Sequence, residues 1–213
     1  MRFEDRIDAG RRLAALVGDL ADRACVVCGL PRGGVVVAAE VARAIGAPLD
    51  VLVARKLRTP GRPELAMGAV CEGDRADALI DEDLIGLLGI ARDRVDREAE
   101  TRFAEANRMA RVYRDGRAPE PIVGRTAVVV DDGVATGWTI RAAMRALRAR
   151  EPERIVLAIP VGPVETLRLL EEEADRVEFV GSARAFLGVG GFYDDFHQLE
   201  DDEVIRALHA DGG

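Results

Sequence analysis

The 213-residue sequence has only three cysteines and two histidines, and no apolar run approaches the roughly 18 residues that span a bilayer. Three cysteines cannot all pair, and their spacing is not that of a disulfide framework, which favours a reducing compartment such as the cytoplasm. No apolar signal segment follows the first residues, so we expect no targeting sequence and no membrane span. Cys25 and Cys28 would point to opposite faces of a strand, which argues against a zinc site.

Basic residues are also outnumbered, with 30 Lys and Arg against 38 Asp and Glu, for a net charge of -8. This balance argues against nucleic acid or a membrane surface as partner, but a local basic pocket for a phosphorylated small molecule remains compatible with it. A hydrophobic content of 48% is typical of a folded globular chain, and the length predicts one domain over 1–213. Lysine is nearly absent: Lys56 is the single lysine among 29 arginines.

Short apolar runs alternate with amphipathic stretches, which indicates an α/β fold with buried parallel strands. The runs predict strands at 24–29, 50–54, 66–73, 77–80, 126–132, 154–160 and 176–180. The amphipathic stretches predict helices at 3–21, 35–46, 91–115, 138–150 and 163–174, and the acids at 81–83 open a further helix.

Four local features refine this pattern. The helix 3–21 would carry one apolar side, formed by Ile7, Leu13, Leu16, Val17 and Leu20. The helix 91–115 would pack on the core through the stripe Val95, Ala99, Phe103, Ala106, Ala110 and Tyr113. The stretch 58–64 (RTPGRPE) is typical of an exposed, mobile loop, and the tail 182–204 is expected to be irregular.

The segment 128–139 (VVVDDGVATGWT) ends an apolar strand with two adjacent carboxylates, Asp131 and Asp132. Ligands of open α/β sheets bind beyond the carboxyl ends of strands, where small residues and a helix N-terminus suit an anion. Thr136 and Thr139 add hydroxyl donors, while the carboxylates accept from hydroxyl groups. The segment therefore indicates a ribose 5-phosphate, and the alternative is a plain turn with two incidental acids.

Two further positions carry suitable chemistry. In the loop 29–34 (GLPRGG), two glycines allow close approach to a ligand and Arg32 offers fixed donors for phosphate, although the same residues form plain turns. Lys56 stands beside Arg55 after the strand 50–54, where the sheet would offer its ligand-binding edge. A compact lysine in a chain that otherwise uses arginine indicates a specific demand, and the alternative is an ordinary surface lysine.

Aromatic residues gather near the end of the chain. Phe192, Tyr193 and Phe196 lie among glycines and acids, where aromatic rings are able to stack on a flat substrate. The alternative is that they anchor the C-terminal segment to the core.

The segment 128–139 resembles the signature of the type I phosphoribosyltransferases, which combines an apolar strand, two acids and a loop of the form ATGxT. The loop 29–34 looks like the pyrophosphate loop of that family, and the order of the two loops also matches. The resemblance covers roughly residues 3–206. Short, uncharacterised bacterial members are most similar, through Arg-Lys-x6-Pro-Glu-x-Ala-x-Gly-Ala from Arg55 and Phe-Tyr-x-Asp-Phe near the end.

This resemblance implies an open, mostly parallel twisted sheet flanked by helices, with a mobile loop and a small hood built from about 1–22 and 181–213. It implies transfer of a 5-phosphoribosyl group from phosphoribosyl pyrophosphate (PRPP) to a nucleobase-like acceptor, with Mg2+ as cofactor, in the nucleotide metabolism of the cytoplasm. It also implies a homodimer. The residues that it implies to be catalytic are Arg32, Lys56, Asp131 and Asp132, and the last two would contact Mg2+ mostly through ribose hydroxyls and water.

The implied PRPP contacts are Pro31, Arg32, Gly33, Gly34, Arg55, Lys56, Asp131, Asp132, Gly133, Val134, Ala135, Thr136, Gly137, Trp138 and Thr139, and the implied acceptor contacts are Phe192, Tyr193 and Phe196. Enzymes for 6-oxopurines carry an acid three residues after the second acid, where this sequence has Ala135. The ATG form is more similar to adenine or orotate enzymes, or to the uncharacterised members. Two other hypotheses remain: a non-catalytic sensor of PRPP or a nucleotide with the same fold, and an unrelated phosphosugar-binding enzyme.

Overall fold

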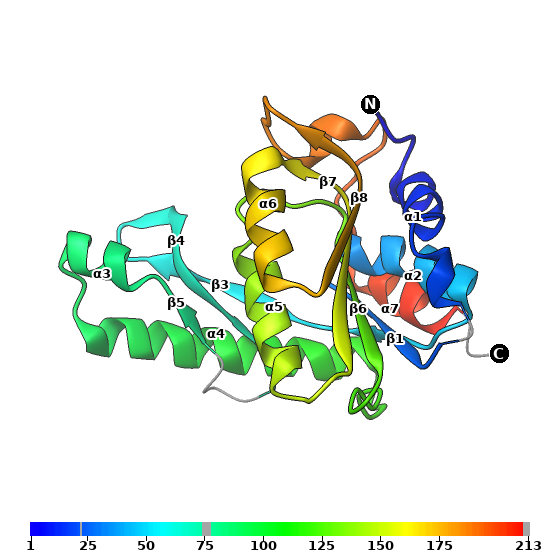
Figure 1. Cartoon of the computed structure of the whole chain (residues 1–213). Helices are drawn as coiled ribbons and strands as arrows, with labels where there is room; N and C mark the ends of the chain where they lie inside the picture. The colour runs from blue at the N-terminus through cyan, green and yellow to red at the C-terminus, as the bar shows by residue number, and fades with distance from the viewer. Residues whose placement is uncertain (22, 74–77, 211–213) are drawn as a thin grey trace.

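The computed structural model describes residues 1–21, 23–73 and 78–210 of the chain (Figure 1). Residue 77, where the expected strand 77–80 begins, lies outside the described residues. So do residues 22 and 211–213, which end the two expected hood segments. No helix in the described ranges combines the length and the hydropathy that crossing a bilayer requires.

Five parallel strands form the central sheet, in the order β2-β1-β6-β7-β8. They are β1 (Cys25–Gly29), β2 (Leu49–Val51), β6 (Thr126–Val130), β7 (Arg154–Pro163) and β8 (Arg176–Ala183). Strands covered on both faces have no solvent side, which is why β1 and β6 are continuous apolar runs. The predicted parallel α/β sheet is confirmed.

Helices cover both faces of this sheet (Figure 1). They are α1 (Arg6–Ala14), the short η1 (Gly18–Leu20), α2 (Gly33–Ile45), α5 (Trp138–Arg148) and α6 (Val164–Glu173). The first three pack on the face that carries Cys25, and α5 and α6 pack on the face that carries Cys28. The two thiols therefore lie on opposite faces, as the strand geometry predicts.

A second sheet projects to one side of the first (Figure 1). It is antiparallel, in the order β3-β4-β5, and its strands are β3 (Ala54–Thr59), β4 (Arg62–Cys71) and β5 (Leu79–Ile80). It packs with α3 (Glu82–Leu88) and the long α4 (Arg92–Tyr113). The predicted apolar stripe of α4 is confirmed, because Val95 and Ala99 pack in this second core while Ala106, Ala110 and Tyr113 pack beside β2.

Two expectations about the first 64 residues are wrong. The helix expected over 3–21 ends at Ala14, and the chain turns before η1. Ile7, within α1, and Leu16, in the turn, are 39% and 38% exposed rather than on the expected apolar side. The segment 58–64 is largely exposed as expected, but the turn is shorter than the expected loop, because β3 runs to Thr59 and β4 starts at Arg62. Gly61 in this turn has a positive φ of 76°. The parallel strand β2 ends at Val51. Lys56 therefore lies within the antiparallel strand β3 instead of directly following a parallel strand.

The tail is more ordered than expected. It contains the short η3 (Val189–Phe192) and the helix α7 (Asp201–His209), which packs against α2 and α4. Glu200 and Glu203 form a reciprocal capping box at the start of α7. Glutamate is not among the residues preferred at an N-cap, so the usual helix-start pattern did not mark α7 in the sequence.

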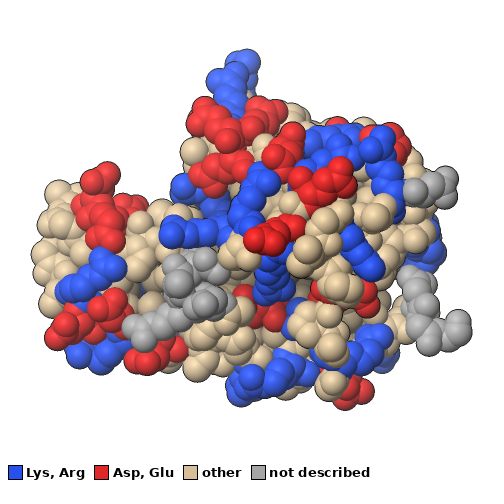
Figure 2. Space-filling view, turned by 60° about the horizontal axis from the view of Figure 1, so that its bottom comes forward, with Lys and Arg blue, Asp and Glu red and all other residues tan. Residues whose placement is uncertain are grey.

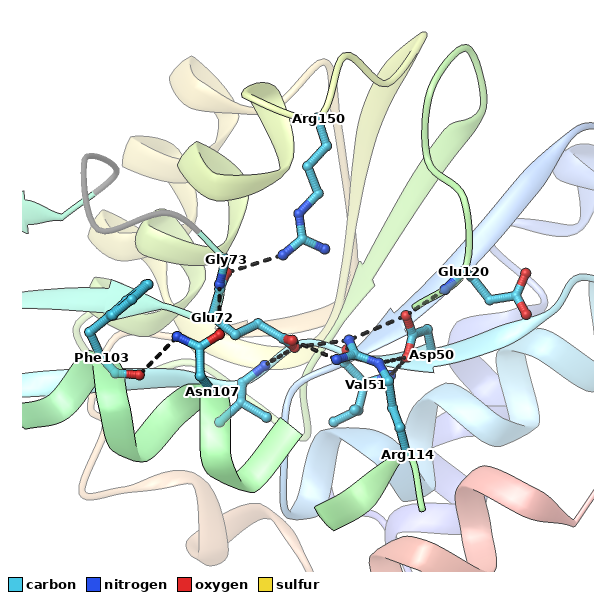
Figure 3. Close-up of polar contacts among 10 residues, drawn as sticks. Asp50, Val51, Glu72, Gly73, Phe103, Asn107, Arg114, Glu120 and Arg150 are labelled. Carbon is cyan, nitrogen blue, oxygen red and sulfur yellow. Dashed lines mark hydrogen bonds and ion pairs between the residues drawn. The ribbon is translucent and has the colours of Figure 1, made fainter. Parts of the chain in front are cut away.

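A buried ionic cluster joins the two sheets (Figure 3). Arg114, directly after α4, donates to Asp50 of β2 at 2.7 Å and to Glu72 after β4 at 2.6 Å. It also donates to the carbonyl of Val51 at 2.6 Å. All three charged side chains are almost fully buried, so each carboxylate depends on the guanidinium for its compensation.

We expect Arg114→Ala to lower the free energy of unfolding by about 3–5 kcal/mol, because it leaves two buried carboxylates without their counter-ion. Chemical denaturation measures this loss. Arg108→Ala, an exposed position on the same helix, is the matched control and should change stability by about 0.5 kcal/mol or less. Equal stabilities of the two variants would contradict the bracing role of Arg114.

Candidate functional site

The two glycine-containing loops predicted from the sequence meet at one edge of the central sheet. Gly29 and Val130, the last residues of β1 and β6, are direct partners across the parallel pair, so both loops leave the sheet side by side. A Cβ on Gly33 would lie 1.7 Å from Oδ2 of Asp132, and one on Gly34 would lie 2.7 Å from Cα of Asp131. No side chain fits at either glycine while the loops keep this approach.

The two aspartates lie beside each other at the carboxyl end of β6. Oδ1 of Asp131 accepts the backbone N–H of Asp132 at 2.8 Å, and Oδ2 of Asp132 accepts from Nε of Arg6 at 2.8 Å. Both side chains are partly buried. Burial, and then the negative charge of Asp132, raise the pKa of Asp131 well above its ordinary range. Burial also raises the pKa of Asp132, against the opposing charge of Arg6.

The loop after the aspartates is held by its ends. The N–H of Val134 donates to the carbonyl of Val161 on β7 at 2.9 Å, and Oγ1 of Thr166 donates to the carbonyl of Ala135 at 2.9 Å. Gly137 has a φ of 78° and starts α5 at Trp138, in the predicted place. The loop is therefore fixed to the sheet on one side.

Its other side presents hydrogen-bond donors. Ala135 and Thr136 are exposed, and no side chain caps the N-terminus of α5. Within the described ranges, the hydroxyls of Thr136 and Thr139 have no hydrogen-bond partner among the protein atoms. Helix N-terminal amides and two hydroxyls facing outward together suit a phosphate group.

Arg6 is the site residue that sequence reasoning missed. Its guanidinium is buried, contacts Asp132, donates to the carbonyl of His197 at 3.0 Å and lies over the ring of Phe196 at 3.9 Å. It comes from α1, 126 positions before Asp132. Nothing local distinguishes it from the other 28 arginines, so only the tertiary contact identifies it.

The two ends of the chain pair with each other beneath the aspartates. The N–H of Phe3 donates to the carbonyl of Phe192 at 2.8 Å, and the N–H of Asp194 donates to the carbonyl of Phe3 at 2.9 Å. Tyr193 is buried between the rings of Phe3 and Phe196, and its hydroxyl donates to the carbonyl of Asp132 at 2.6 Å. These contacts correspond to the anchoring alternative for Tyr193 and Phe196. Phe192 instead stacks on Phe186 and stays partly exposed.

Arg32 lies in the predicted loop, but the C-terminal segment holds its guanidinium. Nη1 donates to the carbonyl of Leu199 at 2.6 Å, and Nε lies 3.0 Å from Oδ1 of Asp201. The hydroxyl of Tyr113 donates to the same Asp201 oxygen at 2.8 Å, and burial raises the pKa of Tyr113 to about 12. Arg32 thus starts α2 with its side chain oriented by α7. The contact with Asp201 had no signal in the sequence.

Lys56 and Arg55 lie on β3 of the second sheet. Nε of Arg55 contacts Oε1 of Glu105 at 3.2 Å. Lys56 is exposed and lines a cavity of about 480 Å³ with Arg58 and Glu64. Within the described part of the chain, no hydrogen bond or ion pair joins either residue to the loops that carry Arg32 and Asp131. Their contact with a ligand stays a prediction.

A family model described as the phosphoribosyl transferase domain matches residues 4–185. Two Mycobacterium tuberculosis proteins, "Putative phosphoribosyl transferase MT0597" of strain CDC 1551 and "Putative phosphoribosyl transferase Rv0571c" of strain H37Rv, are each 46% identical over 208 residues. The match covers 97% of this chain and 46% of each relative. The chain therefore spans less than half the length of these curated relatives.

Solved structures agree with this match. The protein TT1426 from Thermus thermophilus is 39% identical with a TM-score of 0.81, over 98% of both chains. A purine phosphoribosyltransferase from Pyrococcus horikoshii is 15% identical with a TM-score of 0.50, over 92% of this chain and 93% of that one. The second likeness shows the shared fold alone.

Gly33→Ala tests the contact between the two loops. We expect it to lower the free energy of unfolding by about 1–3 kcal/mol, because the new methyl group would overlap Asp132 and force the loops apart. Gly18→Ala is the control, since a Cβ there meets nothing within 4 Å. Thermal or chemical unfolding of both variants measures the difference, and a Gly33→Ala protein as stable as the control would refute the close approach.

Asp131→Asn should stabilise the ligand-free protein at pH 7. The folded-state pKa lies above the ordinary 3.8, so ionisation costs stability as pH rises through 3.8. The amide keeps the acceptor for the N–H of Asp132 and removes that cost, so the variant should be the more stable protein at pH 7. Unfolding at pH 7 and near pH 4 measures the gain, which should shrink at the lower pH. Glu172→Gln removes the charge of an exposed carboxylate on α6 and should leave the free energy of unfolding unchanged at both pH values.

Proposed function

Because the chain belongs to the phosphoribosyl transferase domain family, we propose that it transfers the 5-phosphoribosyl group of PRPP to a nucleobase-like acceptor and releases pyrophosphate. One observation carries the proposal: Gly33 and Gly34 touch the two aspartates that precede the donor-rich loop 133–139. PRPP has a phosphate, vicinal hydroxyls and a pyrophosphate in sequence along one ribose. The loop 133–139, the two aspartates and the loop 31–34 would offer matching chemistry to these three groups.

The ribose end of PRPP fits the loop that follows β6. The amides and hydroxyls around Thr136 and Thr139 would hold the 5-phosphate at the start of α5. Asp131 and Asp132 would accept hydrogen bonds from the ribose hydroxyls, since ionised carboxylates are acceptors only. Arg6 would keep Asp132 ionised and oriented through its 2.8 Å contact.

The pyrophosphate end fits the loop 31–34. The bond between C1 and the pyrophosphate oxygen breaks ahead of attack, which gives an oxocarbenium-like sugar and leaves negative charge on pyrophosphate. Pro31, Gly33 and Gly34 would bring the backbone close to that group, while Arg32 and Lys56 would neutralise its charge. Arg55, beside Lys56, would add a second charge from β3.

Mg2+ fits this arrangement as an ion held chiefly by substrate oxygens. In the described ranges, no group of three or more His, Cys, Asp or Glu is arranged to hold a metal. Asp131 and Asp132 supply two carboxylates beside the position of the ribose hydroxyls, which suits a hard ion that keeps waters and binds phosphates. When bound, Mg2+ would neutralise pyrophosphate charge.

The acceptor would lie against the aromatic tail. Phe192, stacked on Phe186 and partly exposed, offers a face to a flat ring, while Tyr193 and Phe196 support it from below. The product would then be a nucleotide, which connects the protein to nucleotide metabolism. The homodimer and the cytoplasmic location stay predictions.

The decisive experiment measures pyrophosphate release from PRPP with Mg2+ over a panel of free bases, alongside calorimetric binding of PRPP. We expect turnover with one base class. We expect Asp131→Asn/Asp132→Asn to lose PRPP affinity by at least about a hundredfold, since each of two charge-assisted hydrogen bonds contributes about 1.5–3 kcal/mol. Folding of that variant is checked by its unfolding curve.

Two outcomes would change the assignment. Tight PRPP binding without turnover of any base would favour the sensor of the same fold over the enzyme. Undiminished PRPP affinity in the double variant, with Glu171→Gln/Glu172→Gln as the exposed control of equal charge, would refute the site itself.

A further inference from the structure

A second cavity, of about 730 Å³, lies at the opposite edge of the central sheet from the candidate site. It is bounded by the end of α4, the connection 116–123, Glu72 and Gly73 after β4, and Arg150 after α5. The start of α5 carries the loop 133–139 and its end approaches this cavity. The 11 residues of α5 separate the loop 133–139 from this cavity by about 16 Å. The cavity shares no lining residue with the loops around Asp131.

Four arginines line this cavity, and three of them, besides the Arg114 of the ionic cluster, come from different elements. Arg111 comes from α4, Arg117 from the connection before β6, and Arg150 from the turn after α5. Arg150 donates to the carbonyl of Glu72 at 3.1 Å, and Nη2 of Arg117 lies 3.2 Å from Nε2 of His209. Among the described residues, no ion pair joins any of the three to a carboxylate. Within the described ranges their charge has no carboxylate partner, although the chain carries a net charge of -8.

The carboxylates nearby do not supply that compensation (Figure 3). Asp50 and Glu72 are both bound by Arg114, and they also accept backbone N–H groups from Val51 and Val53 respectively. The carboxylate of Glu120 points away from Arg114, and its ion pair is with Arg125 at 3.9 Å. The ionic cluster thus forms a rigid wall without directing a free carboxylate at the arginines.

Besides the arginines, the lining includes the polar residues Glu72, Asn107 and Glu120, and another part of it is apolar. Ala110 and Ile122 are buried in the wall, and Pro119 and Val123 stand at the rim, where Val123 is 69% exposed. Figure 2 shows basic and acidic side chains interspersed over the face of the molecule turned towards the viewer. Guanidinium groups bind phosphate through paired donors and stack on flat rings.

We propose that this arginine pocket, lined by Arg111, Arg117 and Arg150, binds a phosphate monoester that carries a ring, the chemistry of a mononucleotide. The arginines hold the phosphate, and Ala110, Ile122 and Val123 contact the ring. A cavity of this volume is within the range of small-molecule sites. The inference does not rest on the proposed transfer reaction, because the pocket stands on other residues.

Calorimetry with three probes tests the pocket: adenosine 5′-monophosphate, ribose 5-phosphate and inorganic phosphate. We expect the nucleotide to bind most tightly, because it alone offers both a phosphate and a flat ring. Arg111→Gln/Arg150→Gln should weaken this binding by at least about tenfold, since two charge-assisted contacts are lost. The control is Arg108→Gln/Arg145→Gln, which makes the same charge change on the exposed surfaces of α4 and α5 and should bind like wild type.

Binding at the candidate donor site is separated by repeating the titration in Asp131→Asn/Asp132→Asn. If Arg111→Gln/Arg150→Gln still weakens nucleotide binding when it is combined with the two aspartate substitutions, the arginine pocket is distinct from the donor site. Unchanged nucleotide binding in Arg111→Gln/Arg150→Gln, or equal losses in that variant and its control, would overturn the proposal. Inorganic phosphate that binds as tightly as the nucleotide would overturn the role of the apolar wall. Failure of PRPP turnover leaves these outcomes unaffected.

Discussion

The close approach of two loops at the ends of β1 and β6 is the constraint on which the candidate site depends. Adjacent parallel strands end at the same edge, so the residues after Gly29 and Val130 must share a small space. Glycine at 33 and 34 makes that sharing feasible, because a methyl group at either position would overlap an aspartate. Every chemical role argued for this edge needs the two motifs in contact.

Charge is concentrated in two buried places, and each ties distant segments together. Arg6 joins α1 to Asp132 and, through the carbonyl of His197, to the tail. Arg114 joins α4 to both sheets through Asp50 and Glu72. A buried pair contributes little net stability compared with apolar packing, but it penalises any arrangement that separates the partners. We interpret the two clusters as contacts that fix the positions of the candidate site and of the second sheet relative to the central sheet.

The candidate site also contains groups that lower the stability of the ligand-free fold. Two neighbouring carboxylates with raised pKa values are unfavourable in the absence of a ligand, as is an uncapped helix start beside them. Such arrangements persist where they serve binding, because ligand hydroxyls and an anion would satisfy them. The aromatic tail beneath, with Tyr193 bonded to the backbone of Asp132, restricts the movement of this segment.

The amino-acid sequence by itself determined the α/β class, the strands β1, β6 and β7 and the apolar stripe of α4. It also predicted an anion-binding loop at residues 131–139. Each of these depends on local composition or on a short spacing, such as a continuous apolar run or two acids before small residues. Lys56 shows the limit of that approach: its position after an apolar stretch suggested the end of a parallel strand, whereas β3 pairs with β4 instead.

Only the tertiary structure decided which arginine meets Asp132, where the guanidinium of Arg32 is held, and that Tyr193 is buried rather than open to a substrate. These contacts join residues that are 61 to 169 positions apart, such as Tyr193 with Asp132 and Arg32 with Asp201. No periodicity or motif encodes them, because 29 arginines are locally alike and only the packing of the helices on the sheet selects among them.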